Sequence, residues 1–162
     1  LQVGGVGAEA VRAGAGAARP LPHRLAPVAE VRGVLFVDDS NGTNPTSTRC
    51  ALEACPRPAV VLVGGKSKGL DLADLLDALA DHARAVVGIG TTGPEIVRRL
   101  ADRVCAVDGG PTMASAVRAA ADLARPGDAV LLSPAFSSLD EYPSFVARGR
   151  AFQEAVAGLA AD

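Results

Sequence analysis

Short apolar runs alternate along the chain with stretches in which apolar residues recur at helical spacing, and this alternation constrains the fold more than any other feature. The strand-like runs are Val34–Val37, Ala59–Val63, Ala85–Ile89, Val104–Val107 and Ala129–Leu132. Helical stripes open at Pro45 and cover residues 72–79, 94–100, 113–123 and 145–159. Strands that are apolar on both faces, each followed by an amphipathic helix, are typical of parallel sheets. We therefore predict an α/β fold with a mostly parallel open sheet and helices on both faces.

Composition limits the classes of function. The 162 residues suit one domain, and with only 3% aromatic residues the core must be built from Val, Leu, Ala and Ile. The net charge of −2 provides no basic surface for nucleic acid. No apolar run approaches the roughly 20 residues that span a bilayer. We predict a soluble protein that neither binds nucleic acid nor inserts into a membrane.

The cysteines and histidines do not form a recognisable framework. Cys50, Cys55 and Cys105 are an odd set without CxxC spacing, and His23 and His82 lie far apart. This pattern argues against disulfides and against a metal site. We expect reduced thiols and a cytoplasmic location.

The first residues differ from the rest of the chain. Residues 1–20 are rich in Ala and Gly, begin at Leu1 without an initiator Met and show no strand pattern. We expect them to be the tail of a preceding central domain and its linker, so that the chain is the cut end of a longer protein. The compact domain is then predicted to cover residues 21–162.

Three polar clusters follow predicted strands, at residues 39–44, 64–69 and 133–138. The carboxyl ends of parallel strands joined by right-handed crossovers lie along one edge of a sheet, where ligands of open α/β folds bind. Asn44 and Pro45 suit the N-cap and first position of a helix, whose N-terminus favours an anion. We predict that the three clusters face one pocket.

Two phosphate-binding motifs can be tested against this edge. The Gly64–Gly69 loop is not a Walker A motif, because Val occupies the position of the leading glycine. Gly88, Gly90 and Gly93 do match GxGxxG, and Asp108 follows about 20 residues after Gly88. The match indicates either a dinucleotide site in a non-enzymatic binding module or a tight turn that needs glycine without a ligand, and the second interpretation is favoured.

Four ordered motifs then point to a family. They are residues 21–24 (LPHR), 39–44 (DSNGTN), 64–69 (GGKSKG) and 132–140 (LSPAFSSLD), followed by Phe145 and Arg148-Gly149. In order and approximate spacing this set resembles the C-terminal domain of the Mur ligases, and within them the members that add D-glutamate, over Leu21 to Leu159. The resemblance implies a Rossmann-like fold.

It also implies an activity. Mur ligases are ATP-dependent amide ligases of peptidoglycan synthesis. They convert a substrate carboxylate, here that of UDP-N-acetylmuramoyl-L-alanine, to an acyl phosphate. The amine of D-glutamate then attacks the acyl carbon and phosphate leaves. ATP and Mg²⁺ would be held mainly by the central domain. The resemblance therefore places no catalytic residue and no metal ligand in this chain, makes the N-terminal and central domains its partners, and implies that the chain alone is inactive. A related ligase adding another amino acid, such as L-glutamate, is the alternative.

Carried over to this sequence, the family's binding residues fall into two sets. The D-glutamate set is Thr43 and Lys68 for the α-carboxylate, with Ser138, Leu139 and the backbone near Phe145 for the side-chain carboxylate. The nucleotide set is Arg24 and Asp39. A dicarboxylate needs a cation and several neutral donors, and the first set supplies them.

One position departs from the family pattern. Many members carry Lys where this chain has Asn41, so one positive charge is missing. We expect Lys66, across the predicted pocket edge, to supply a compensating charge.

Overall fold

A single six-stranded sheet forms the centre of the computed structural model, which describes residues 21–67, 69 and 71–161. The strands are β1 (Ala26–Val31), β2 (Val34–Asp38), β3 (Ala59–Gly64), β4 (Ala83–Ile89), β5 (Ala106–Asp108) and β6 (Ala129–Leu132), in the order β1-β2-β6-β3-β4-β5. β1 runs antiparallel to β2, and the other neighbouring strands are parallel. The predicted mostly parallel α/β architecture is confirmed.

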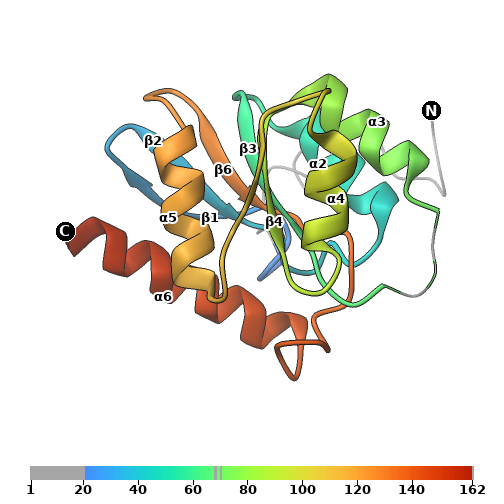
Figure 1. Cartoon of the computed structure of the whole chain (residues 1–162). Coiled ribbons are helices and arrows are strands. Elements are labelled where there is room, and N and C mark those ends of the chain that lie inside the picture. Colours follow the sequence, from blue (N-terminus) through green and yellow to red (C-terminus); the bar gives the residue numbers. More distant parts are fainter. Residues whose placement is uncertain (1–20, 68, 70, 162) are drawn as a thin grey trace, which may run out of the picture.

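Helices cover both faces of this sheet (Figure 1). They are α2 (Pro45–Ala54), α3 (Ala73–His82), α4 (Gly93–Leu100), α5 (Met113–Leu123) and α6 (Phe145–Ala161). The first three share one apolar cluster with the sheet, and α5 and α6 share a second cluster on the opposite face. β3 and β6 contribute side chains to both clusters, which is why these strands are apolar at every position.

The five predicted strands are all present, with boundaries that differ by at most two residues. The predicted helix start after β2 is also confirmed. The Asn44 side chain accepts a hydrogen bond of 2.9 Å from Ser47 N, and Pro45 occupies the first turn, where its missing N–H needs no partner.

The edge strand β1 was not predicted. It joins β2 through the two residues Arg32 and Gly33, which have positive φ angles of 52° and 78°. Two such residues form the tight turn whose twist matches a hairpin. The sequence does not indicate this strand, because Pro27 interrupts the strand pattern. Pro27 lies at an irregularity in the pairing with β2, and proline is tolerated there because β1 is an edge strand.

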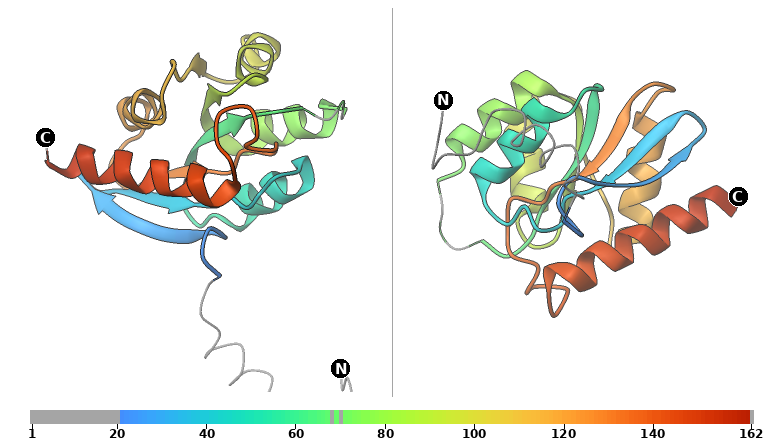
Figure 2. Two further views of the ribbon diagram at one scale, coloured as in Figure 1. Left: turned by 90° about the horizontal axis from the view of Figure 1, so that it is seen from below. Right: turned by 180° about the vertical axis from the view of Figure 1, so that it is seen from behind.

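The strand order places a topological switch point at the carboxyl edge. From β2 the chain passes through α2 to β3, which leaves a gap in the sheet that β6 fills later. It then continues through β4 to the edge strand β5. From β5 it returns through α5, on the opposite face of the sheet, to β6. Figure 2 shows α2 and α5 on opposite sides of the sheet and α6 lying along β1 and β2. Connections that leave in opposite directions from adjacent strands open a binding crevice between them. The loops after β2, β3 and β6 therefore meet at this point.

Two sequence predictions concern residues outside this description. Residues 1–20 and Lys68 are among the residues that the structure does not describe, so the domain boundary near residue 21 stays a prediction. Within the described part of the chain, no helix is long and apolar enough to cross a membrane.

Phe152 offers a test of the α6 interface. Its side chain is fully buried and its ring lies 6.4 Å from that of Phe36 on β2. Phe152→Ala should lower the free energy of unfolding of this chain by about 3–5 kcal/mol, because it leaves a cavity between α6 and the sheet. Urea denaturation measures the change. The exposed neighbour Glu154, changed to Ala, should shift stability by less than about 0.5 kcal/mol, and equal losses in both variants would contradict the packing described.

Candidate functional site

Three polar loops come together at the carboxyl edge of the sheet, as predicted. The Ser133 hydroxyl donates to Asp39 Oδ2 at 2.7 Å, which joins the loops after β6 and β2. Ala135 N donates to the Gly42 carbonyl at 2.9 Å in the same pair of loops. Lys66 N donates to the Ser137 carbonyl at 2.9 Å, which adds the loop after β3. Backbone bonds across the loops hold them as one unit.

Asp39 is nearly buried, with 4% of its surface exposed. Besides the bond from Ser133, it accepts one of 3.2 Å from Leu25 N at its Oδ1 atom. Burial raises the pKa of Asp39 above its ordinary value, although these two hydrogen bonds and the nearby Arg24 cation act in the opposite direction. The carboxylate thus joins the N-terminal segment to the β6 loop.

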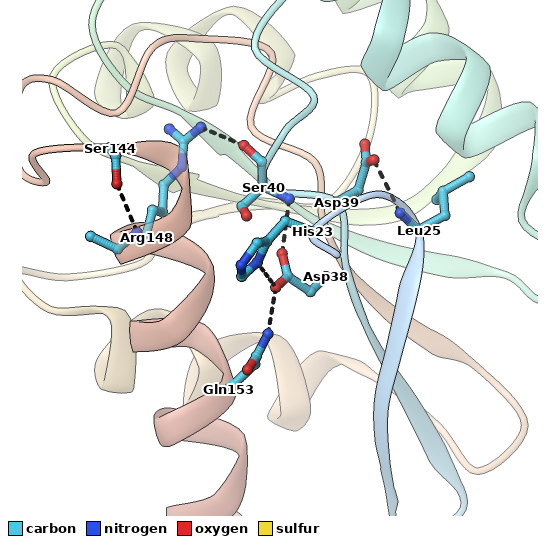
Figure 3. Close-up of polar contacts among 9 residues, drawn as sticks. His23, Leu25, Asp38, Asp39, Ser40, Ser144, Arg148 and Gln153 are labelled. Carbon is cyan, nitrogen blue, oxygen red and sulfur yellow. Dashed lines mark hydrogen bonds and ion pairs between the residues drawn. The ribbon is translucent and has the colours of Figure 1, made fainter. Parts of the chain in front are cut away.

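The adjacent Asp38 is fully buried and joins three other parts of the chain (Figure 3). Its Oδ2 atom lies 2.7 Å from His23 Nδ1 and 2.8 Å from Gln153 Nε2 on α6, while Oδ1 accepts a bond of 2.9 Å from Ser40 N. Gly149 makes room for this cluster, since a Cβ there would collide with the His23 ring. The Asp38 carboxylate thus connects His23, the loop after β2 and helix α6.

Arg148 is the buried cation of the site, with 1% of its surface exposed. Its Nη2 atom donates to the carbonyls of Ser40 at 3.1 Å and Phe136 at 3.0 Å, and Figure 3 shows the bond to Ser40. Burial lowers the pKa of Arg148 to about 10, against the attraction of Asp140 and other anionic groups. The side chain therefore stays charged at neutral pH and fastens α6 to the loops after β2 and β6.

Two pockets flank helix α2. One of about 380 Å³ contains both residues predicted to bind nucleotide, Arg24 and Asp39. Its other lining residues are Leu25, Thr46, Ser47, Cys50, Ala51 and Ala54. The second, of about 440 Å³, opens at the N-terminus of the helix around Asn44 and Thr46 and is bordered by Arg49, Asp71 and Asp74. Thr46 lines both pockets, so they share an edge at the first turn of α2.

The residues predicted to bind the amino acid come from the loops after β2, β3 and β6 and from the start of α6. Thr43 is half-buried between β2 and α2, and Ser138 is 3% exposed in the loop after β6. Leu139 beside it is 61% exposed, and the Phe145 ring lies 6.2 Å from that of His23. The structure thus brings Thr43 and Ser138 onto adjoining loops. Lys68 is not among the described residues.

Close packing within the glycine-rich turn after β4 explains why glycine occupies positions 88 and 93. A Cβ on Gly88 would lie 2.7 Å from the Gly93 carbonyl oxygen, and one on Gly93 would lie 2.7 Å from the Gly88 carbonyl carbon. The strand and helix therefore approach too closely for any side chain at either position. Asp108, the partner expected of a dinucleotide site, accepts a bond of 2.6 Å from Gly110 N in its own loop. These contacts favour the tight-turn interpretation.

Residues 23–136 match the family model described as Mur ligase, glutamate ligase domain. The chain belongs to the Mur ligase family. The matched range includes β1 through β6, the loops after β2 and β3 and the start of the loop after β6, and it ends before Ser138 and α6.

The relatives agree with this assignment. The chain is 45% identical over 141 residues to the UDP-N-acetylmuramoylalanine–D-glutamate ligase of Bordetella avium, covering 87% of this chain and 28% of the relative. The chain thus spans less than a third of the length of that ligase.

Solved structures show the same fold at lower identity. A domain from a Mur-type ligase of Haemophilus ducreyi matches with a TM-score of 0.58 and 18% identity, over 85% of this chain and all of that domain. A bifunctional folylpolyglutamate synthase/dihydrofolate synthase from Yersinia pestis matches with a TM-score of 0.62 and 23% identity, over 95% of this chain and 34% of that protein. Both likenesses concern the fold of this Mur ligase domain.

Sequence reasoning assigned no role to three side chains that organise the site. Asp38 was visible only as the first of two adjacent aspartates, and Arg148 and Asp140 only as members of quoted motifs. Their contacts reach residues far along the chain, such as Gln153 from Asp38, and no local pattern encodes such pairs. Among the residues that the structure describes, no group of three His, Cys, Asp or Glu side chains is placed to hold a metal ion.

The raised pKa of Asp39 predicts a pH-dependent effect on stability. The folded state holds the Asp39 proton more tightly than the unfolded chain, so this group favours folding at low pH and loses that contribution as the pH rises through the folded pKa. The amide introduced by Asp39→Asn does not titrate. The stability of wild type relative to this variant should therefore fall as the pH is raised from about 4 to about 7. Urea denaturation at a series of pH values measures it, and a constant difference would contradict the prediction.

Proposed function

We propose that this chain is the amino-acid-binding C-terminal domain of a longer ATP-dependent ligase that adds D-glutamate to UDP-N-acetylmuramoyl-L-alanine in the cytoplasm. The observation that carries the proposal is the identity of 45% over 141 residues to a ligase named for that reaction. The hydrogen bonds that join the loops after β2, β3 and β6 support it, because the predicted residues Asp39, Thr43 and Ser138 lie on two of these joined loops.

The amino-acid side of the crevice suits a dicarboxylate. Thr43 and Ser138 offer hydroxyl donors from adjoining loops, and Lys68, from the loop after β3, would add the cation. A hydrogen bond to a charged group is worth about 1.5–3 kcal/mol, so each donor can contribute measurably to affinity. Ser138, which is 3% exposed, would contact a ligand that enters beside Leu139 and Phe145.

The nucleotide side suits a ribose and a phosphate. Arg24 is exposed at the mouth of the 380 Å³ pocket, where a guanidinium can meet a phosphate or stack on a base. Asp39 has already accepted two hydrogen bonds, and its remaining lone pairs suit a ribose hydroxyl. ATP bound here would touch the same carboxylate that steadies the loop bearing Ser138.

The reaction itself needs the rest of the enzyme. ATP supplies the phosphoryl group that activates the substrate carboxylate, and we assign Mg²⁺ and most of the ATP contacts to the central domain. The C-terminal domain formed by the present chain would hold the amino acid and orient its amine towards the acyl phosphate. We therefore expect the isolated chain to be inactive and the closure of the domains to complete the site.

Phosphate release by the full-length enzyme tests the proposal. It is supplied with ATP, Mg²⁺ and UDP-N-acetylmuramoyl-L-alanine, with D-glutamate and L-glutamate compared. Release that depends on D-glutamate is expected. Release with L-glutamate or another amino acid would keep the ligase and change its specificity, and no release with any amino acid would refute the function.

Thr43 provides a matched pair of variants. Thr43→Val removes the hydroxyl and keeps the shape, whereas Thr43→Ser keeps the hydroxyl. We expect Thr43→Val to raise KM for D-glutamate by about tenfold or more, which is the scale of one bond to a carboxylate. Thr43→Ser should stay near wild type, and KM for ATP should not change. Equal effects of both variants would exclude the proposed role of the hydroxyl.

Lys66 tests the proposed compensation for Asn41. Its exposed side chain lies on the loop whose backbone pairs with Ser137. If it replaces the missing charge, Lys66→Ala should raise KM for D-glutamate about three- to tenfold, and the increase should shrink at high salt because an exposed charge is screened. Unchanged kinetics in steady-state assays would rule this role out. Ser67→Ala, on the same loop without a charge, is the control.

A further inference from the structure

The glycine-rich turn packs against two other loops of the site. Gly90 has a positive φ of 59°, and a Cβ there would lie 2.8 Å from Gly65 Cα and 2.6 Å from Asp140 Oδ2. The turn therefore presses on the loop after β3 through Gly65 and on the loop after β6 through Asp140. Glycine at position 90 permits this three-way approach.

Asp140 binds the turn directly. Its Oδ2 atom accepts a bond of 2.9 Å from Thr91 N and lies 3.2 Å from the Thr91 hydroxyl. The positive charge of the buried Arg148 also attracts this carboxylate. A carboxylate of the chain itself thus binds the backbone N–H of Thr91, just before the N-cap of helix α4.

The two threonines of the turn also hold the loop after β3. Thr92 is buried, and its hydroxyl accepts a bond of 3.0 Å from Gly65 N and lies 3.0 Å from the Gly65 carbonyl oxygen. The Thr91 hydroxyl lies 2.9 Å from the same carbonyl. Gly65 is therefore fixed to the turn just before Lys66 pairs with Ser137.

These contacts hold Ser138 and Leu139 from both sides. Ser137, the residue before them, is bonded to Lys66 N, and Asp140, the residue after them, is bonded to Thr91. Both anchors lead back to the same turn. The two-residue segment between the anchors is the part of the loop assigned to the side-chain carboxylate of the amino acid.

We propose that Thr91 and Asp140 are positioning residues for the amino-acid site, and that the glycine-rich turn serves this site as a brace. They act through Ser138 and Leu139 and do not touch the amino acid. The inference rests on the proposed function. It gives the GxGxxG sequence a role without a dinucleotide.

The test uses the full-length enzyme with Asp140→Ala, Asp140→Asn and Thr91→Val. Asp140→Ala should raise KM for D-glutamate by about tenfold, on the scale of one charge-assisted bond. Asp140→Asn, which keeps an acceptor oxygen, should recover part of the loss. Thr91→Val removes the hydroxyl contacts with Asp140 and Gly65 but keeps the bond from Thr91 N, so it should raise KM for D-glutamate by less than Asp140→Ala does. KM for ATP should stay unchanged in every variant.

Asp108→Ala is the matched control. Asp108 lies at the same sheet edge, but its carboxylate bonds only within its own loop, to Gly110 N, among the contacts found in the described part of the chain. This variant should leave KM for D-glutamate unchanged. A comparable increase would show a general loosening of the edge and overturn the inference.

The outcomes separate the two proposals. A wild-type enzyme without D-glutamate-dependent phosphate release refutes the proposed function. An active wild type with an unchanged KM for D-glutamate in Asp140→Ala, or with KM for ATP raised equally, overturns the inference and leaves the function standing. If Asp140→Ala does not fold, Thr91→Val carries the test, because it removes the hydroxyl contacts that tie the turn to Asp140 and to Gly65, and an unchanged KM for D-glutamate then overturns the inference.

Discussion

The guanidinium of Arg148 joins parts of the chain that are distant in sequence, and the shape of the crevice depends on it. One Nη2 atom reaches the carbonyls of Ser40 and Phe136, so α6 cannot leave the sheet without releasing the loops after β2 and β6. Breaking such a buried interaction leaves polar groups without partners, which costs several kcal/mol. The cation also lies close to Asp38 and Asp140, the two carboxylates that organise the remaining loops.

Asp38 extends this arrangement to the entrance of the domain. His23 and Leu25 have positive φ angles of 61° and 45°, which non-glycine residues adopt only when their surroundings hold them there. The bond from His23 to Asp38, and that from Leu25 N to Asp39, supply that restraint. The exact path of the segment entering β1 therefore depends on two adjacent carboxylates at the end of β2.

Local patterns predicted most helices and strands because the residues that mark them are consecutive or recur at helical spacing. Val and Leu runs on β3 and β6 are buried on both faces, and the Asn44 cap acts within four residues. The order of the strands in the sheet could not be predicted from the sequence, because nothing in the sequence of β6 shows that it lies between β2 and β3. β1 was missed because Pro27 and Glu30 weaken its pattern, and its pairing depends on tertiary contact with β2.

The site was predictable to the level of loops but not of bonds. Parallel crossovers place the polar clusters at one edge, so the adjacency of Asp39 and Ser133 follows from topology. The bond from Thr91 to Asp140 spans 49 residues and depends on how two loops bend after leaving the sheet. On the proposed function, this difference has a mechanistic meaning. Residues that contact ligands reside in motifs that sequence can match, whereas the contacts that hold these residues in place are spread over loops with different origins. Amino-acid specificity in this domain would then depend as much on Thr91 and Asp140, to which the sequence assigned no role, as on the residues predicted to bind the ligand, because a hydroxyl misplaced by about an ångström forfeits much of its bond to a carboxylate.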